Sequence, residues 1–188
     1  MRKGKTAKLA YGGIFTALSL IFLFLAGIVP KMEMVLYGIS ALMPALAIIE
    51  NAAIEKRGSI LPGVMVYVAT VLLGILILPN KVAVLPYIIF FGIYAVVKFY
   101  IDKFNVKWVR GAFKAAYFAA TFCIAYFALG GILLSEFELP DMMFPFLLAG
   151  AIVFMFLFDY IFSLAVSIYF RKIHPRAFRN IDEPLGEK

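Results

Sequence analysis

The chain has 188 residues, of which 64% are hydrophobic and 15% charged, and its formal net charge is +7. With a mean hydropathy of +0.98, it has too little polar sequence for a separate soluble domain. Positive charge in a soluble protein would suggest a nucleic-acid partner, but no polar stretch with interleaved basic and aromatic residues is present, so we expect none.

Six long apolar runs follow one another along the chain: Leu9–Val29, Met34–Ile54, Ile60–Leu78, Val82–Ile101, Ala112–Leu134 and Met142–Tyr169. Because a helix rises 1.5 Å per residue, each run is about long enough to cross a hydrocarbon core of ~30 Å. The sequence therefore predicts an all-α integral membrane protein, a compact bundle of six transmembrane helices. We assign the bundle to residues 1–170 and a short basic-to-polar tail to residues 171–188.

Positive charge is distributed unevenly between the two ends of these runs. All 18 Lys and Arg except Lys31 and Lys81 lie in or beside the N-terminus, the second and fourth connections, and the C-terminal tail. Because connections rich in Lys and Arg remain on the cytoplasmic side, this pattern predicts that both termini are cytoplasmic. Trp108, flanked by Lys107 and Arg110, is typical of an anchor at the membrane interface.

Small residues spaced three or four apart line one face of the first run: Ala10, Gly13 and Ala17. Such a face allows close approach of another helix, which holds membrane helices together. The neighbour is either a helix of the same chain or a different subunit. A similar stripe follows the third run: Gly63, Tyr67, Thr70 and Gly74. We expect this second stripe to pack within the chain.

Two acidic residues, Glu50 and Asp159, lie within apolar runs, where a charge is costly unless it meets a partner or water. Glu50 lies at a depth close to that of Lys98, which predicts a Glu50–Lys98 ion pair. In the alternative, the Lys98 side chain extends to the lipid headgroups.

Asp159 begins a polar stripe that continues along the sixth run, and the fifth run carries a second polar stripe. Counting residues from the inner ends places three pairs at equal depth: Asp159 with Thr121, Ser163 with Tyr117, and Ser167 with Lys114. We interpret the two stripes as an interhelical hydrogen-bond network. The alternative is a proton or cation relay through Asp159.

Polar and aromatic residues also gather near the predicted outer ends of the runs: Lys31, Glu33, Tyr37, Asn80, Lys81, Tyr87, Glu136, Glu138 and Asp141. Polar groups backed by aromatic rings at the mouth of a helix bundle are typical of a small-molecule pocket. They are equally typical of solvated loops. Lys31 and Lys81 are the two side-chain cations that an anionic solute could meet on this side.

Motifs for catalysis and metal binding are absent from the sequence. It contains no His-Glu-x-x-His pair, no Gly-x-Ser-x-Gly elbow and no Walker A phosphate loop. Cys123 and His174 are each the single residue of their type, so neither a disulfide within the chain nor a Cys/His metal cluster is expected. We therefore predict a protein without catalytic residues, bound metal or cofactor.

The layout of the whole chain resembles the substrate-binding S component of energy-coupling-factor transporters, which are small bacterial proteins with six spans. The shared features are the size, the basic start Arg2–Ala10 and the small-residue face Ala10, Gly13 and Ala17. In that family an alanine-rich face of the first helix docks a transmembrane coupling subunit, and vitamins or metal ions bind near the outer side. The connection after the first run is short here, whereas family members often cap the ligand with a longer loop.

The resemblance implies a subunit in the bacterial cell membrane that binds an unidentified small solute, vitamin-like or ionic. Its partners would be the lipid bilayer, a coupling subunit and separate ATPase subunits that drive uptake. Two other classes remain open: a structural or assembly membrane protein without a ligand, and a proton-linked carrier that acts alone.

Overall fold

The computed structural model describes residues 2–29, 31–55, 59–102, 104–133, 144–169 and 171, with the side chains of 2–8, 53–55 and 128–133 left out. These residues form helices and contain no strand. The helices are α1 (Arg2–Ala26), α2 (Glu33–Glu55), α3 (Leu61–Ile77), the 3₁₀ turn η1 (Val82–Val84), the π-helical turn η2 (Tyr87–Phe91), α4 (Gly92–Ile101), α5 (Lys107–Leu133) and α6 (Phe144–Ile168).

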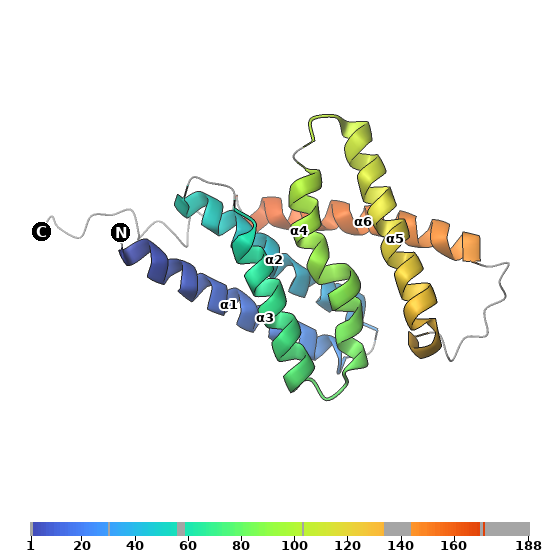
Figure 1. Ribbon diagram of the computed structural model, residues 1–188, viewed down its shortest axis with the longest axis horizontal. Helices are drawn as coiled ribbons and strands as arrows, with labels where there is room; N and C mark the ends of the chain where they lie inside the picture. The colour runs from blue at the N-terminus through green and yellow to red at the C-terminus, as the bar shows by residue number, and fades with distance from the viewer. Residues whose placement is uncertain are drawn as a thin grey trace, which may run out of the picture.

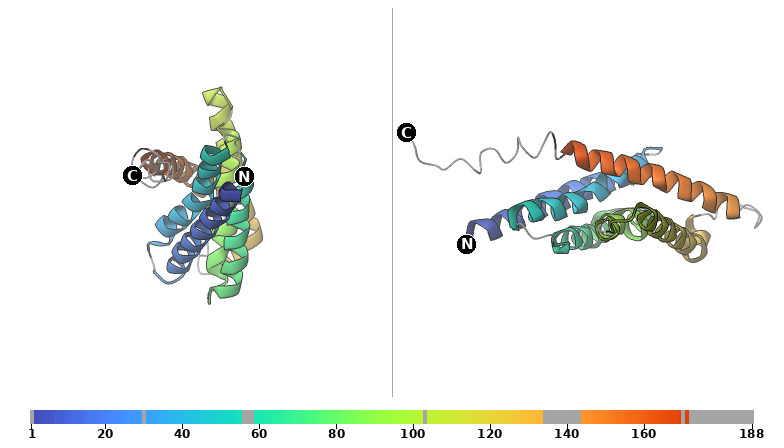
Figure 2. Two further views of the ribbon diagram at one scale, coloured as in Figure 1. Left: turned by 90° about the vertical axis from the view of Figure 1, so that its left-hand side faces the viewer. Right: turned by 90° about the horizontal axis from the view of Figure 1, so that it is seen from above.

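The helices lie in two layers that cross each other. One layer contains α3, α4 and α5, which run side by side in Figure 1, and the other contains α1, α2 and α6. Figure 2 shows the same division from above, with α3, α4 and α5 together below the other three helices. As a result, α6 runs across α4 and α5 instead of alongside them.

The apolar core lies where the two layers meet. Leu23 of α1, Ala41 of α2 and Phe162 of α6 are almost completely buried there, together with Val84 and Phe91 from the segment before α4. Within its own layer, α1 packs along α2. Lipid provides no hydrophobic drive between helices, so close packing of side chains is what holds membrane helices together.

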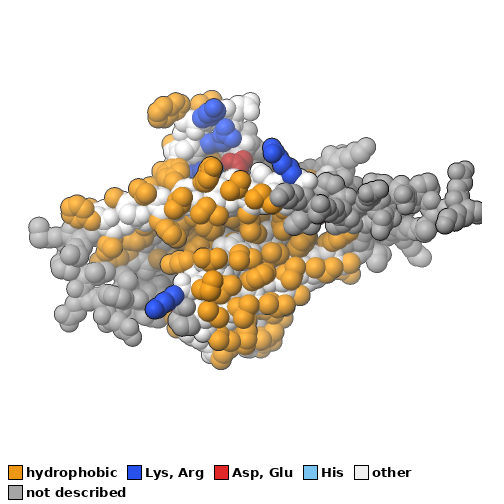
Figure 3. Space-filling view, turned by 180° about the vertical axis from the view of Figure 1, so that it is seen from behind, with side chains coloured by type: hydrophobic (Ala, Val, Ile, Leu, Met, Phe, Trp, Pro, Cys, Tyr) orange, Lys and Arg blue, Asp and Glu red, His pale blue; other side chains and the backbone are white. Residues whose placement is uncertain are grey.

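Apolar helices long enough to cross a membrane are confirmed for four segments of the described chain. By length and composition they are Leu9–Ala26, Glu33–Ala52, Val82–Ile101 and Phe144–Ile168. The third apolar run forms a shorter helix of 17 residues, α3. Hydrophobic side chains cover much of the face seen in Figure 3, as expected for a surface in contact with lipid.

The small-residue stripe on α3 packs within the chain, as predicted. A Cβ atom added to Gly63 would lie 2.4 Å from Cγ1 of Ile48 and 2.7 Å from the carbonyl oxygen of Pro44. One added to Gly74 would lie 3.1 Å from a methyl group of Leu23. These glycines allow α3 to approach α2 and α1 closely.

Candidate functional site

The fourth apolar run is one continuous helical segment whose hydrogen-bonding pattern changes along its length, and we call it the interrupted segment. It begins with the 3₁₀ turn η1, passes through Leu85 and Pro86, continues as the π-helical turn η2 and only then becomes α4. Pro86 has no backbone N–H to donate, and the N–H of Gly92 bonds back to the carbonyl of Tyr87, five residues earlier. Such changes of helix type leave carbonyl groups free to accept bonds from other helices.

Three tyrosine hydroxyls from three different helices donate to carbonyl oxygens of this segment. The bonds are Tyr37 of α2 to Ala83 (2.7 Å), Tyr67 of α3 to Ile88 (2.9 Å) and Tyr117 of α5 to Phe90 (3.2 Å). Backbone groups at membrane depth must be satisfied within the protein. The tyrosines therefore hold the interrupted segment in place from three sides.

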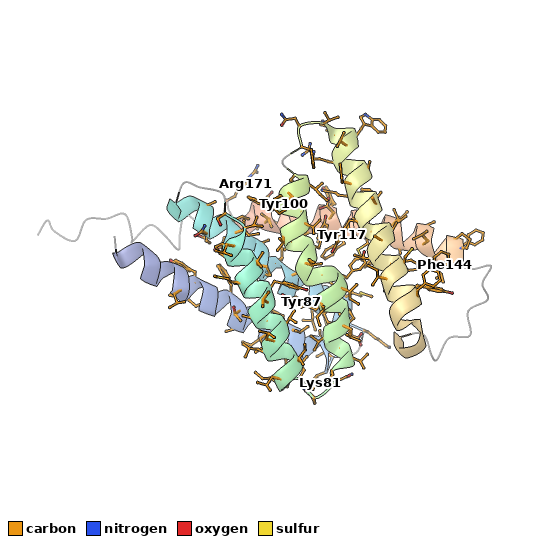
Figure 4. The ribbon with its side chains drawn as sticks, in the orientation of Figure 1. Lys81, Tyr87, Tyr100, Tyr117, Phe144 and Arg171 are labelled. Carbon is orange, nitrogen blue, oxygen red and sulfur yellow. The ribbon has the colours of Figure 1, made fainter. Side chains whose placement is uncertain are left out.

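Four buried hydroxyl groups meet beside this segment, and we call Ser19, Ser40, Thr70 and Tyr87 the hydroxyl cluster. The Ser19 hydroxyl lies 2.8 Å from that of Ser40 and 3.1 Å from that of Tyr87. Ser40 also donates to the carbonyl oxygen of Ser19 at 2.9 Å. In Figure 4, Tyr87 lies inward of Lys81, towards the middle of the molecule.

Thr70 is the exception within the hydroxyl cluster. Its side chain is completely buried and lies beside the Tyr87 hydroxyl, but in a geometry that falls outside ordinary hydrogen-bond distances and angles. A buried hydroxyl without a partner is costly, and natural proteins retain few of them. The hydroxyl cluster therefore has unused hydrogen-bonding capacity at Thr70.

A second polar centre, the ion cluster, joins α4, α5 and α6 through Tyr94, Lys98, Asp102, Lys114 and Asp159. The Tyr94 hydroxyl donates to Oδ1 of Asp159 at 2.5 Å. Lys98 donates to the same oxygen, and Lys114 donates to Oδ2 at 2.6 Å. Both lysines also lie 3.4 Å from carboxylate oxygens of Asp102.

The ion cluster contains two cations and two anions, so its charges balance. The side chains of Lys98 and Lys114 are each 11% exposed and that of Asp159 is 13% exposed, whereas Asp102 reaches solvent at 40%. The Lys98 ammonium also lies 6.0 Å from the centre of the Phe162 ring. Each oxygen of Asp159 is bound by an ammonium group. The geometry therefore favours a structural role, in which the ion cluster holds α4, α5 and α6 together, over a proton relay.

The predicted Glu50–Lys98 ion pair is wrong. Lys98 pairs with Asp102 and Asp159, while Oε1 of the buried Glu50 accepts a hydrogen bond from Tyr169 at 2.8 Å. The error has a geometric cause. Equal depth brings side chains together only when helices run alongside each other, and α2 lies in the layer that crosses the layer of α4.

The predicted network between the fifth and sixth runs is wrong in its pairing for the same reason. Thr121 donates to Tyr117 and Phe118 carbonyls of its own helix at 2.9 Å and 3.1 Å. Ser163 donates to the Asp159 carbonyl at 2.7 Å. Such local bonds satisfy each hydroxyl without crossing between helices. Ser167 is exposed and lies outside the ion cluster.

Two of the residues near the predicted outer ends of the runs, Asn80 and Lys81, lie in the α3–α4 turn. Their side chains form hydrogen bonds to nearby backbone groups. The Lys81 ammonium donates to the carbonyls of Ile75 and Leu76 at the C-terminal end of α3, where a cation suits the helix dipole. The Asn80 side chain accepts a hydrogen bond from the N–H of Val82 at 3.0 Å, which positions η1. Capping thus accounts for both residues without a ligand.

Of the other residues near the predicted outer ends, the four that the structure describes differ in their exposure. Lys31 and Glu33 are exposed, and Lys31 has a positive φ of 70°. Tyr37 and Tyr87 are buried within the bundle. Glu136, Glu138 and Asp141 lie outside the described residues.

Hollows border these elements in the part of the chain that the structure describes. A cavity of about 110 Å³ lies beside the ion cluster and is lined in part by Lys98 and Asp102. An apolar groove of about 300 Å³ separates α2 from α6, and one of about 440 Å³ lies between α1 and α3. Gly12 and Gly13 line the larger groove.

The small-residue face of α1 is uncovered in the described part of the chain. Ala10, Gly13 and Ala17 are exposed. Cβ atoms added to Gly12 and Gly13 would meet no other atom within 4 Å. The interpretation that this face packs against a helix of the same chain is therefore wrong for the described residues, and the docking interpretation stays open.

Sequence reasoning missed Ser19, Ser40, Tyr94 and Asp102. Tyr94 and Asp102 stand one helical turn before and after Lys98, a spacing that places all three on one face of α4. That spacing was a usable signal. The serines of α1 and α2 give none, because the contact of Ser19 with Tyr87 depends on the position of η2.

No family model, no curated protein and no solved structure matches this chain. Three features of the structure bear on function: the interrupted fourth segment, the two polar clusters and the exposed face of α1.

Proposed function

We propose that this protein is the small-solute-binding membrane subunit of an ATP-driven uptake transporter. In this proposal it crosses a bacterial cell membrane six times, with both termini in the cytoplasm. The observation that carries the proposal is the change of helix type in the fourth segment, next to the buried hydroxyl cluster. π-Helical turns within α-helices are frequent at functional sites, and helices with irregular backbone form the substrate sites of many transporters.

The hydroxyl cluster is the proposed binding site. Ser19, Ser40 and Tyr87 already bond to one another, whereas the hydroxyl of Thr70 lies beside them without a well-formed hydrogen bond and would supply a donor and an acceptor for a solute. This position replaces the outer mouth as the centre of recognition, because Lys81 is engaged with the end of α3.

Energy would come from separate subunits, since the sequence has no phosphate-binding loop for ATP. The exposed face of α1 supports docking of a coupling subunit, because Ala10, Gly13 and Ala17 leave room for a neighbouring helix. The same chain would thus bind solute in the bundle and contact its partner at the lipid-facing surface.

The proposal is tested by affinity purification of the full chain from its native membrane at low detergent, with mass spectrometry of proteins and small molecules. We expect an ATPase pair, a coupling subunit and one enriched solute. Replacing Gly13 and Ala17 with Leu should remove the partner proteins and leave the solute in place. Val153→Leu, on an exposed part of α6, is the control and should keep both.

Recovery of neither an ATPase nor a solute would overturn the proposal in favour of a structural membrane protein. Transport that needs Asp159 and proceeds without any ATPase would instead establish a proton-linked carrier.

A further inference from the structure

The turn between α4 and α5 exposes an apolar tip. Trp108 is 90% exposed, and Phe104, Val106 and Phe113 are each about half exposed. The rings of Phe104 and Phe113 stack with centroids 5.2 Å apart and planes within 1°. The stack links the two sides of the turn and leaves both rings about half exposed.

Two side-chain cations of α5, Lys107 and Arg110, follow this turn. Lys98 and Lys114 are paired with Asp102 and Asp159. Lys107 and Arg110 lie in the first turn of α5 and form no ion pair within the described residues. Figure 3 shows Lys and Arg side chains next to hydrophobic ones at this end of the molecule.

We propose that the α4–α5 turn binds the headgroup of an anionic phospholipid. Aromatic rings such as that of Trp108 favour the boundary between the headgroups and the acyl chains. Lys107 and Arg110 then lie at the level of the phosphates, where anionic lipid is attracted to juxtamembrane cations. Charge complementarity selects an anionic lipid over a zwitterionic one. The inference depends on residence in a membrane and is independent of solute binding.

Trp108 is the single tryptophan of the chain, so its fluorescence reports on this turn alone. The full chain is reconstituted in phosphatidylcholine vesicles that contain a fixed minor fraction of brominated phosphatidylglycerol, a quencher of nearby tryptophan. Matched vesicles carry the bromine on the same fraction of phosphatidylcholine. We expect the brominated phosphatidylglycerol to quench Trp108 several-fold more strongly, because the anionic lipid is enriched at the turn.

The double variant K107Q/R110Q should reduce quenching by phosphatidylglycerol to the level given by phosphatidylcholine. K31Q removes an exposed cation from the α1–α2 turn and should leave the wild-type preference intact. Thermal melting of each variant in the same vesicles shows whether it is folded.

Equal quenching by the two lipids in the wild-type protein would overturn the inference, as would a loss of preference in K31Q as large as in K107Q/R110Q. Quenching by neither lipid would also overturn the inference, because Trp108 would then lie away from the lipids. Loss of the preference on addition of millimolar inorganic phosphate, but not of equivalent chloride, would mean that the turn takes free phosphate instead.

Discussion

Asp159 is the residue on which three helices converge. It accepts bonds from Tyr94 and Lys98 of α4 and from Lys114 of α5, while its own backbone belongs to α6. Two ammonium groups at a side-chain exposure of 11% depend on this carboxylate and on Asp102 for their counter-charge. The chain thus uses one acid to fix the crossing of its two layers.

Asp159→Asn should destabilise the protein by about 3 kcal/mol or more. It leaves two buried lysines with Asp102 as their remaining counterion within the ion cluster, and Asp102 is 40% exposed. The loss is measured as a lower melting temperature in detergent. Ser167→Ala, at an exposed position on the same helix, is the matched control and should melt like the wild type. A melting curve for Asp159→Asn that matches the control would show that the ion cluster does not stabilise the bundle.

The interrupted fourth segment depends on its tyrosine donors. Tyr117→Phe removes the hydrogen bond to the Phe90 carbonyl and should cost about 1 kcal/mol. Tyr160→Phe makes the same chemical change at a side chain that is 67% exposed and should cost nothing measurable. Thermal melting of the two variants compares them, and equal stability would mean that lipid or neighbouring groups satisfy the Phe90 carbonyl unaided.

Close packing of α3 gives a second test at the level of the helices. Gly63→Ala would place a methyl group 2.7 Å from the carbonyl oxygen of Pro44, so α2 and α3 would have to separate, at a cost of roughly 1–3 kcal/mol. Gly150→Ala adds the same methyl group where no other atom lies within 4 Å. If both variants melt at the same temperature, α3 is not packed against α2 as described.

The helices themselves were predictable because each apolar run is long and ends at polar residues. The run Met34–Ile54 corresponds to α2 (Glu33–Glu55), and Ile60–Leu78 corresponds to α3 (Leu61–Ile77). The run Val82–Ile101 was correct in length, but its 3₁₀ and π-helical turns were not foreseen. Helix type within an apolar run depends on which neighbours bond to its carbonyls, and those neighbours lie far away in the sequence.

For the whole molecule, the distribution of charge predicts which turns face which compartment. In a Cys123→Ala background, Asn80→Cys and Asn105→Cys place single thiols at two exposed turn positions. We expect a membrane-impermeant maleimide to label Asn80→Cys in intact cells. Asn105→Cys should be labelled only after the membrane is permeabilised, because the connection around it is rich in Lys. The opposite pattern would invert the proposed topology.

The contacts between helices were less predictable than the helices. The prediction that Asp159 lies level with Thr121 assumed antiparallel neighbours, whereas the crossing of α6 brings Lys98 and Lys114 to it. Hydropathy gives the length of each helix and its place in the chain. The angle at which two helices cross is set by the shapes of the side chains between them, which no periodicity encodes.

Removing the hydroxyl of Thr70 tests whether the hydroxyl cluster binds a solute or only stabilises the fold. Valine has almost the same shape and removes a buried hydroxyl that makes no well-formed hydrogen bond, so Thr70→Val should melt at or above the wild-type temperature. If the hydroxyl cluster holds the solute, the variant should lose most of the small molecule that purifies with the wild type, as quantified by mass spectrometry. Thr16→Val, whose hydroxyl bonds to the Gly12 carbonyl, should retain that molecule. A stable Thr70→Val protein that carries as much solute as the wild type would contradict binding at the hydroxyl cluster.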